Sequence, residues 1–168
     1  MSIKSQYMFT NANHIYSKYK SHGSRGFVIL GPPASGKTTF IKSQKIPNWI
    51  DTDDLFSKLN LNWHVNEKNN IDFKLNYMRA DYLLEQSKML GFRLIGSLYY
   101  NYIPDAIIIP PIIIHEAYIN KRNNDNDYPL DKENVYIIRN ELIKKAKDNN
   151  IPIFKTCNEA IRYCEQLN

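Results

Sequence analysis

A glycine-containing segment between an apolar stretch and a helix-forming stretch constrains this chain more than any other feature. Residues 26–30 include the apolar run Phe27–Leu30, which is typical of a buried strand. The next eight residues, Gly31–Thr38, match the spacing G-x-x-x-x-G-K-[ST], and residues 37–44 predict a helix. This order predicts a strand–loop–helix unit whose loop points backbone N–H groups at phosphate oxygens.

The residue types in this loop fit a nucleoside triphosphate with Mg²⁺. The glycines allow a tight backbone, Lys37 is long enough to reach the β- and γ-phosphates, and Thr38 offers a hydroxyl to Mg²⁺. The positive end of the following helix adds a favourable field for an anion. We therefore expect ATP and Mg²⁺ as ligands. The residues expected to bind the nucleotide are Gly31, Pro32, Pro33, Ala34, Ser35, Gly36, Lys37, Thr38 and Thr39.

The composition is that of one globular domain. The chain has 168 residues, 43% of them hydrophobic, and no apolar run approaches the roughly 20 residues of a membrane span. We expect a single domain over residues 1–168, with a lead-in over residues 1–25. The N-terminus lacks the apolar core of a signal peptide, and Cys157 and Cys164 lie too far apart on a helix to form a disulfide. These features predict a cytoplasmic protein with reduced thiols.

Four further apolar segments alternate with predicted helices. They occupy residues 49–50, 92–95, 106–109 and 151–154. Helices are predicted over residues 11–20, 54–59, 71–90, 112–122, 131–149 and 159–167, with Asn158 as the N-cap of the last, and residues 60–70 predict a loop. Because the strands alternate with helices and are apolar without interruption, we expect a parallel sheet covered on both faces.

The order of these parts resembles the small P-loop kinases of metabolites and nucleotides, the shikimate, gluconate and nucleoside-monophosphate kinase group. Three segments carry the resemblance, which covers most of residues 25–168: Gly31–Thr38, Asp51-Thr52-Asp53, and the helix Pro111–Arg122 with the Asn/Asp-rich loop after it. It implies a three-layer αβα P-loop NTPase fold with a five-stranded, mostly parallel sheet and a lid-like loop at about residues 122–130. It also implies transfer of the γ-phosphate of ATP to a small metabolite or nucleotide.

Acids after the second strand and one arginine are the candidate catalytic side chains besides Lys37. Ligands of open parallel sheets gather beyond the carboxyl ends of the strands, so Asp51, Asp53 and Asp54 are expected near the loop. Asp51 or Asp53 is a candidate for binding Mg²⁺ through water, together with Thr38, and Asp53 is alternatively a candidate for accepting the proton of the acceptor hydroxyl. The alternative role of these acids is capping of the next helix. The resemblance adds Arg122 as a cation for the γ-phosphate, and the alternative is a solvated helix end.

Two arginines and one histidine have further possible roles. Arg79 and Arg93 are candidates for binding an anionic acceptor, and the alternative for Arg79, in the middle of a predicted helix, is pairing with an acid. His115, which precedes a glutamate, does not continue into a zinc-binding helix pattern, because Ile119 stands where the second histidine would be. We therefore expect no zinc site there.

Departures from the kinase group keep two alternatives open. The predicted strand at residues 92–95 ends in Gly96-Ser97, not in a glycine triplet or an acid, and the lid region offers only Lys121 and Arg122 as cations. The net charge of +5 without a basic run suits a phosphorylated ligand and allows nucleic acid without indicating it. The alternatives are a polynucleotide 5′-hydroxyl kinase-like enzyme and a catalytically inactive nucleotide-binding or structural protein. The abundance of Asn, Ile and Lys indicates an AT-rich genome, and a viral protein would reside in the host cytoplasm or the virion.

Overall fold

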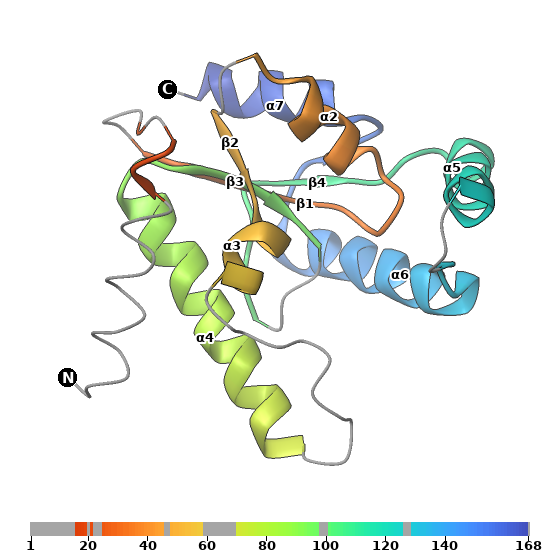
Figure 1. Cartoon of the computed structure of the whole chain (residues 1–168), viewed down its shortest axis with the longest axis horizontal. Coiled ribbons are helices and arrows are strands. Elements are labelled where there is room, and N and C mark those ends of the chain that lie inside the picture. The colour runs from red at the N-terminus through yellow and green to blue at the C-terminus, as the bar shows by residue number, and fades with distance from the viewer. Residues whose placement is uncertain are drawn as a thin grey trace.

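In a computed structural model, the chain folds around one parallel sheet with helices on both faces (Figure 1). The structure describes residues 16–19, 21, 25–45, 48–58, 70–97, 101–125 and 129–167. The strands are β1 (Phe27–Leu30), β2 (Trp49–Asp51), β3 (Arg93–Gly96), β4 (Ala106–Ile108) and β5 (Ile153–Phe154), in the order β2-β3-β1-β4-β5. Every pairing between them is parallel. The predicted α/β class with a five-stranded parallel sheet is confirmed.

The helices lie on the two faces of this sheet, except for one helix that lies beyond the carboxyl ends of the strands. They are α2 (Lys37–Ser43), α3 (Thr52–Lys58), α4 (Asn70–Met89), α5 (Ile112–Asp125), α6 (Lys132–Asn149) and α7 (Cys157–Gln166). Figure 1 shows α2 and α7 on one face, α3, α4 and α6 on the other, and α5 beyond the carboxyl ends of β1 and β4. None of the helices within the described ranges is both long and apolar enough to span a membrane.

Two apolar cores lie on opposite faces of the sheet because side chains alternate along each strand. In β1, Val28 and Leu30 belong to the core that also contains residues of α3, α4 and α6. Phe27 and Ile29 belong to the core that contains the buried face of α7. All four side chains are buried, as expected for the central strand of the sheet. The loop that follows β1 therefore lies at the middle of the edge formed by the carboxyl ends of the strands.

Helix α7 begins earlier than expected, and its N-cap is Thr156 and not the predicted Asn158. The Thr156 side chain accepts a hydrogen bond from the N–H of Glu159, and the Glu159 carboxylate accepts one from the N–H of Thr156. This reciprocal pair satisfies two backbone donors, which a residue inside the first turn cannot do. The prediction is wrong because the Thr-x-x-Glu pattern is a stronger start signal than a single Asn. The two cysteines of α7 are free and buried, as expected.

Helix α5 extends one turn beyond the prediction, so Arg122 lies within the helix and not at the start of a loop. The Asn123 side chain explains the extension, because its amide donates to the carbonyl of Leu130 at 3.0 Å and its oxygen accepts from the Leu130 N–H at 2.6 Å. These bonds hold the segment before α6 against the last turn of α5. Residues 126–128 of the predicted lid-like loop lie outside the described residues, as do residues 11–15 of the predicted first helix and 60–69 of the predicted loop.

Candidate phosphate-binding site

The segment between β1 and α2 forms a tight loop that requires glycine at two positions, Gly36 and Gly31, for different structural reasons. Gly36 has φ +89°, in the left-handed region that glycine adopts most easily, and Ala34 also lies there with φ +59°. At Gly31 the constraint is space, because a Cβ would lie 2.7 Å from the Ser35 hydroxyl oxygen. The Gly31 N–H donates to the carbonyl of Gly96 in β3 at 2.9 Å, which anchors the loop to the sheet.

Lys37 is buried at the centre of the loop. Its Nζ donates hydrogen bonds to the carbonyl oxygens of Gly31 (2.8 Å) and Pro32 (2.7 Å) and to the Ser35 hydroxyl (3.3 Å). Burial lowers the pKa of Lys37 from 10.5 to about 8, and the negative charge of Asp53 is the strongest of the effects that oppose this shift. The Lys37 ammonium therefore lies in an environment that favours a nearby negative charge.

The acids at the end of β2 lie at the same edge of the sheet as the loop, the edge formed by the carboxyl ends of the parallel strands. Asp51 ends β2, and its carboxylate accepts a hydrogen bond from the N–H of Asp53 at 3.0 Å. Because of this bond, α3 begins at Thr52, two residues earlier than predicted, and the alternative capping role holds for Asp51. Burial raises the pKa of Asp51, and Asp53 is exposed in the first turn of α3. Both carboxylates oppose the lowering of the pKa of Lys37, so their negative charges lie within electrostatic reach of its ammonium.

The neighbouring strands contribute no acid at this edge of the sheet. β3, which lies between β2 and β1, ends at Gly96 followed by Ser97, and β4 is followed by Ile109 and Pro110. Among the residues that the structure describes, no three His, Cys, Asp or Glu side chains form a metal-binding group. A hydroxyl and one carboxylate, Thr38 and Asp51, suit Mg²⁺, which is commonly held by one or two protein ligands plus phosphates and water.

Helix α5 carries one residue that contacts the loop and the predicted Arg122 near its end. Arg122 is exposed, its positive charge adds to the lowering of the pKa of Lys37, and its role at the γ-phosphate stays a prediction. His115 is fully buried, and its Nε2 lies 2.8 Å from the carbonyl oxygen of Pro33. The sequence suggested only a zinc role for this histidine, and that role was rejected. Its spacing of seven residues from Arg122, two helical turns, was the signal that places both on one face.

A second unpredicted neighbour of the loop is Cys157 at the start of α7. Its thiol donates a long hydrogen bond to the carbonyl of Ser35, with a distance of 3.7 Å between sulfur and oxygen. Burial raises the pKa of the Cys157 thiol to about 11, so the group is neutral at physiological pH and contributes packing to the loop.

The two arginines proposed for an acceptor lie away from the loop. Arg93 begins β3 at the opposite edge of the sheet, where it forms a 2.9 Å ion pair with Glu165 and lies 5.9 Å from the centroid of the Trp49 ring. These contacts give Arg93 a structural role at this edge of the sheet. Arg79 is exposed on α4 and makes a 3.4 Å hydrogen bond to Asn76.

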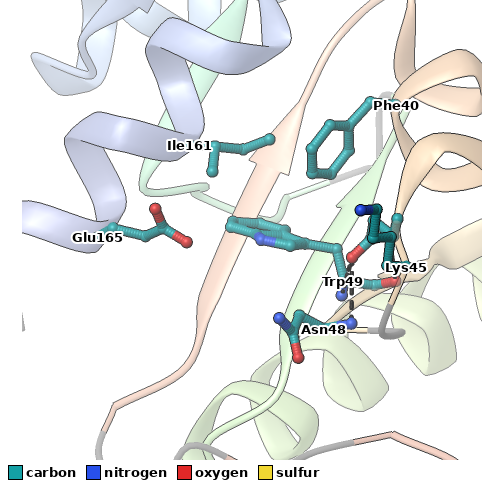
Figure 2. Close-up of a pocket in the computed structure, with 7 residues that line it drawn as sticks. Phe40, Lys45, Asn48, Trp49, Ile161 and Glu165 are labelled. Carbon is teal, nitrogen blue, oxygen red and sulfur yellow. Dashed lines mark hydrogen bonds between the residues drawn. The ribbon is translucent and has the colours of Figure 1, made fainter.

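A pocket of about 350 Å³ on the α2–α7 face is separate from the loop (Figure 2). Its lining is formed by Phe40, Gln44, Lys45, Asn48, Trp49, Ile161 and Glu165. Two polar side chains of this wall are bound within the fold: the Gln44 oxygen accepts from the N–H groups of Asn48 and Trp49, and Glu165 pairs with Arg93. The buried Asn48 Oδ1 has no hydrogen-bond partner among the described residues. Residues 46–47 lie outside the described residues, and we assign no ligand to this pocket.

No family model matches this chain, and a search of curated proteins finds no similar sequence.

Proposed function

We propose that this protein is an ATP- and Mg²⁺-dependent kinase with the three-layer αβα P-loop NTPase fold, and that its acceptor is a small metabolite or nucleotide. The observation that carries the proposal is the buried ammonium of Lys37, which lies inside a glycine-constrained loop and is faced by the charges of Asp51 and Asp53. The parallel sheet in which this loop follows the central strand supports the same conclusion.

Each residue has a role in the proposed transfer. The loop N–H groups and Lys37 bind the β- and γ-phosphates, and Thr38 and Asp51 hold Mg²⁺, which supplies neutralisation of the phosphate charge. The acceptor oxygen attacks the γ-phosphorus, the bond to the β-phosphate oxygen breaks, and ADP leaves. Where the acceptor is a hydroxyl, its proton passes to Asp53. Arg122 neutralises charge on the transferring group.

A second candidate is a protein that binds ATP without transferring phosphate. The specific observation in its favour is that β3 ends in Gly96-Ser97, so no carboxylate stands directly beside the loop on the adjacent strand. This candidate shares the nucleotide site and differs in turnover.

Titration of MgATP into the wild type and into Lys37→Ala and Lys37→Met tests the nucleotide site. We expect affinity to fall by roughly 100-fold in both variants, because a charge-assisted contact to phosphate in a dry site is lost. Lys42→Ala is the matched control, since it removes the same charge from the exposed last turn of the same helix. The proposal fails if the wild type binds no ATP or if the Lys37 variants bind it equally well.

A transfer assay with γ-labelled ATP separates the possible functions. Nucleosides, nucleotides, sugar acids and 5′-hydroxyl oligonucleotides serve as acceptors. Labelling of a small molecule supports the proposed kinase, labelling of the oligonucleotide supports a polynucleotide kinase, and binding without labelling supports the inactive binder. For an active enzyme we expect Asp53→Asn to lower kcat about 100-fold, as for loss of a general base.

A further inference from the structure

His115 connects the phosphate loop to two helices outside it. From α5, its Nε2 meets the carbonyl oxygen of Pro33 at 2.8 Å, across 82 sequence positions. Its other ring nitrogen, Nδ1, lies 3.3 Å from the guanidinium of Arg139 on α6. The same guanidinium nitrogen donates to the carbonyl of Pro110 at 2.7 Å, just after β4. The imidazole is thus a direct connection between the loop, α5 and α6.

The chemistry of these two partners permits only one form of the imidazole. The Pro33 carbonyl can only accept, so Nε2 must carry a hydrogen. The Arg139 guanidinium can only donate, so Nδ1 must keep its lone pair. A second proton on Nδ1 would face Arg139 directly, with the charge of Lys37 also nearby. Tyr136 of α6 packs edge-on against the ring at 6.5 Å, and its hydroxyl donates to Glu116.

The placement of His115 on α5 relates the loop to Arg122. The two residues are seven positions apart, and the buried Ile119 lies between them on the same face. His115 holds the N-terminal part of this face against the carbonyl of Pro33, and the exposed Arg122 lies in the last turn of the same helix. A helix held at one end by a buried hydrogen bond presents its other end in a defined direction.

We propose that His115 is a positioning residue: as a neutral imidazole with its hydrogen on Nε2, it fixes the position of the Pro33 carbonyl and holds the phosphate loop against α5 and α6. The inference about the loop stands on the contacts alone, and its consequence for phosphates rests on the proposed function. His115 itself touches no substrate in this arrangement.

The tautomer is tested directly in the free protein by two-bond ¹H–¹⁵N correlation of the histidine rings. The chain has four histidines, so the His115 signals are assigned by their loss in His115→Gln. We expect the neutral Nε2–H pattern at pH 7, with protonation only below the ordinary histidine range because burial lowers the pKa of His115. A ring hydrogen on Nδ1, or an imidazolium at pH 7, overturns the proposal.

Two substitutions then test positioning. His115→Phe keeps a flat ring and removes the donor, whereas His115→Gln keeps an N–H at a similar reach. We expect shifted backbone amide signals of Ala34, Ser35 and Gly36 in the Phe variant and near-normal signals in the Gln variant. We also expect MgATP affinity to fall about three- to tenfold in the Phe variant, the value of one hydrogen bond, and to recover in the Gln variant.

Tyr136→Phe is the matched control, because it removes a hydroxyl beside the imidazole that does not touch the loop. We expect it to leave loop signals and MgATP affinity unchanged. Unchanged loop amides in folded His115→Phe overturn the proposal, whether or not the protein binds ATP. If His115→Phe does not fold, His115→Gln is compared with His115→Leu, which has no hydrogen-bond donor. The proposal is then overturned if the loop signals of both variants differ equally from those of the wild type. If the wild type does not bind ATP, the proposed function is refuted. The amide signals of the loop still decide whether His115 positions the Pro33 carbonyl.

Discussion

The ammonium of Lys37, the first residue of α2, donates a 2.8 Å hydrogen bond to the carbonyl oxygen of Gly31 at the start of the preceding loop. This contact places a buried positive charge against carbonyl dipoles of the same loop. Because burial lowers the pKa of Lys37 to about 8, a substantial fraction of the lysine is neutral in mildly alkaline solution. Binding of a polyanion restores the charged form, which makes the lysine a reporter of phosphate binding.

MgATP binding at pH 8 should therefore take up protons. We expect Lys37 to contribute about half a proton, since it is half neutral at a pH equal to its pKa and fully charged beside phosphate. The contribution should approach zero at pH 6.5. Calorimetric titrations in buffers of different ionisation enthalpy measure this number. Lys37→Arg keeps the charge at all these pH values and should show no such component, so equal uptake in both proteins would contradict the prediction.

Asp51→Asn should separate the metal role of Asp51 from its capping role. Asparagine caps helices about as well as aspartate, so the free energy of unfolding should change by less than about 0.5 kcal/mol. The gain in ATP affinity produced by Mg²⁺ should fall roughly tenfold, since a carboxylate ligand is lost. Titrations with and without Mg²⁺ measure this gain. Asp54→Asn, at an exposed position in the same turn, is the control, and an undiminished Mg²⁺ effect in Asp51→Asn argues against a metal role.

Alanine at Gly36 and at Gly26 should destabilise the protein for different reasons. At Gly36, φ +89° makes alanine strained by about 1–2 kcal/mol, and the nearest atom, the Cys157 sulfur, is 4.0 Å away. At Gly26 a Cβ would lie 2.1 Å from the Phe92 carbonyl oxygen, so the strand must move and the loss should exceed about 3 kcal/mol. Urea unfolding measures both losses. The reverse order of destabilisation would show that loop strain outweighs the clash.

Thr156→Ala should lower the free energy of unfolding by about 1 kcal/mol, because the N–H of Glu159 loses its side-chain acceptor at the start of α7. Thr156→Ser keeps the hydroxyl and should retain most of the stability. Chemical denaturation of the three proteins tests the difference. Asn158→Ala provides the comparison with the cap expected from sequence, and a larger loss there than at Thr156 would be inconsistent with the observed capping box.

Asp105→Asn should destabilise the fold strongly without changing ATP affinity. The buried Asp105 carboxylate accepts from Lys88 at 2.7 Å, from Arg25 at 2.9 Å and from the N–H of Val28 at 2.9 Å. The variant leaves the largely buried Lys88 without its countercharge, a loss of about 3 kcal/mol. Arg25 is 68% exposed, so Arg25→Ala should cost less than about 1 kcal/mol. Thermal unfolding and MgATP titration check both effects, and a changed ATP affinity would show coupling across the sheet.

Local patterns account for the parts of the fold that the sequence predicted well. The unbroken apolar run of β1, the Gly–Lys–Thr spacing after it and the acidic start of α6 at Asp131 each depend on neighbouring residues in the chain. The cap at Asn158 was wrong for a local reason, because two signals competed within three residues. The end of α5 was missed for a longer-range reason, since it depends on the bonds between Asn123 and Leu130.

The sequence by itself determined the loop, the strand–helix alternation and the parallel sheet, because backbone hydrogen bonding and apolar periodicity are encoded over a few residues. Only the tertiary structure decided which groups interact: the charge of Asp53 opposes the lowering of the pKa of Lys37, His115 binds the carbonyl of Pro33, and Arg93 pairs with Glu165 far from the loop. These interactions depend on the order of the strands and the direction of the connections between them. The strand order depends on the packing of the whole chain, which cannot be read from the spacing of a few neighbouring residues.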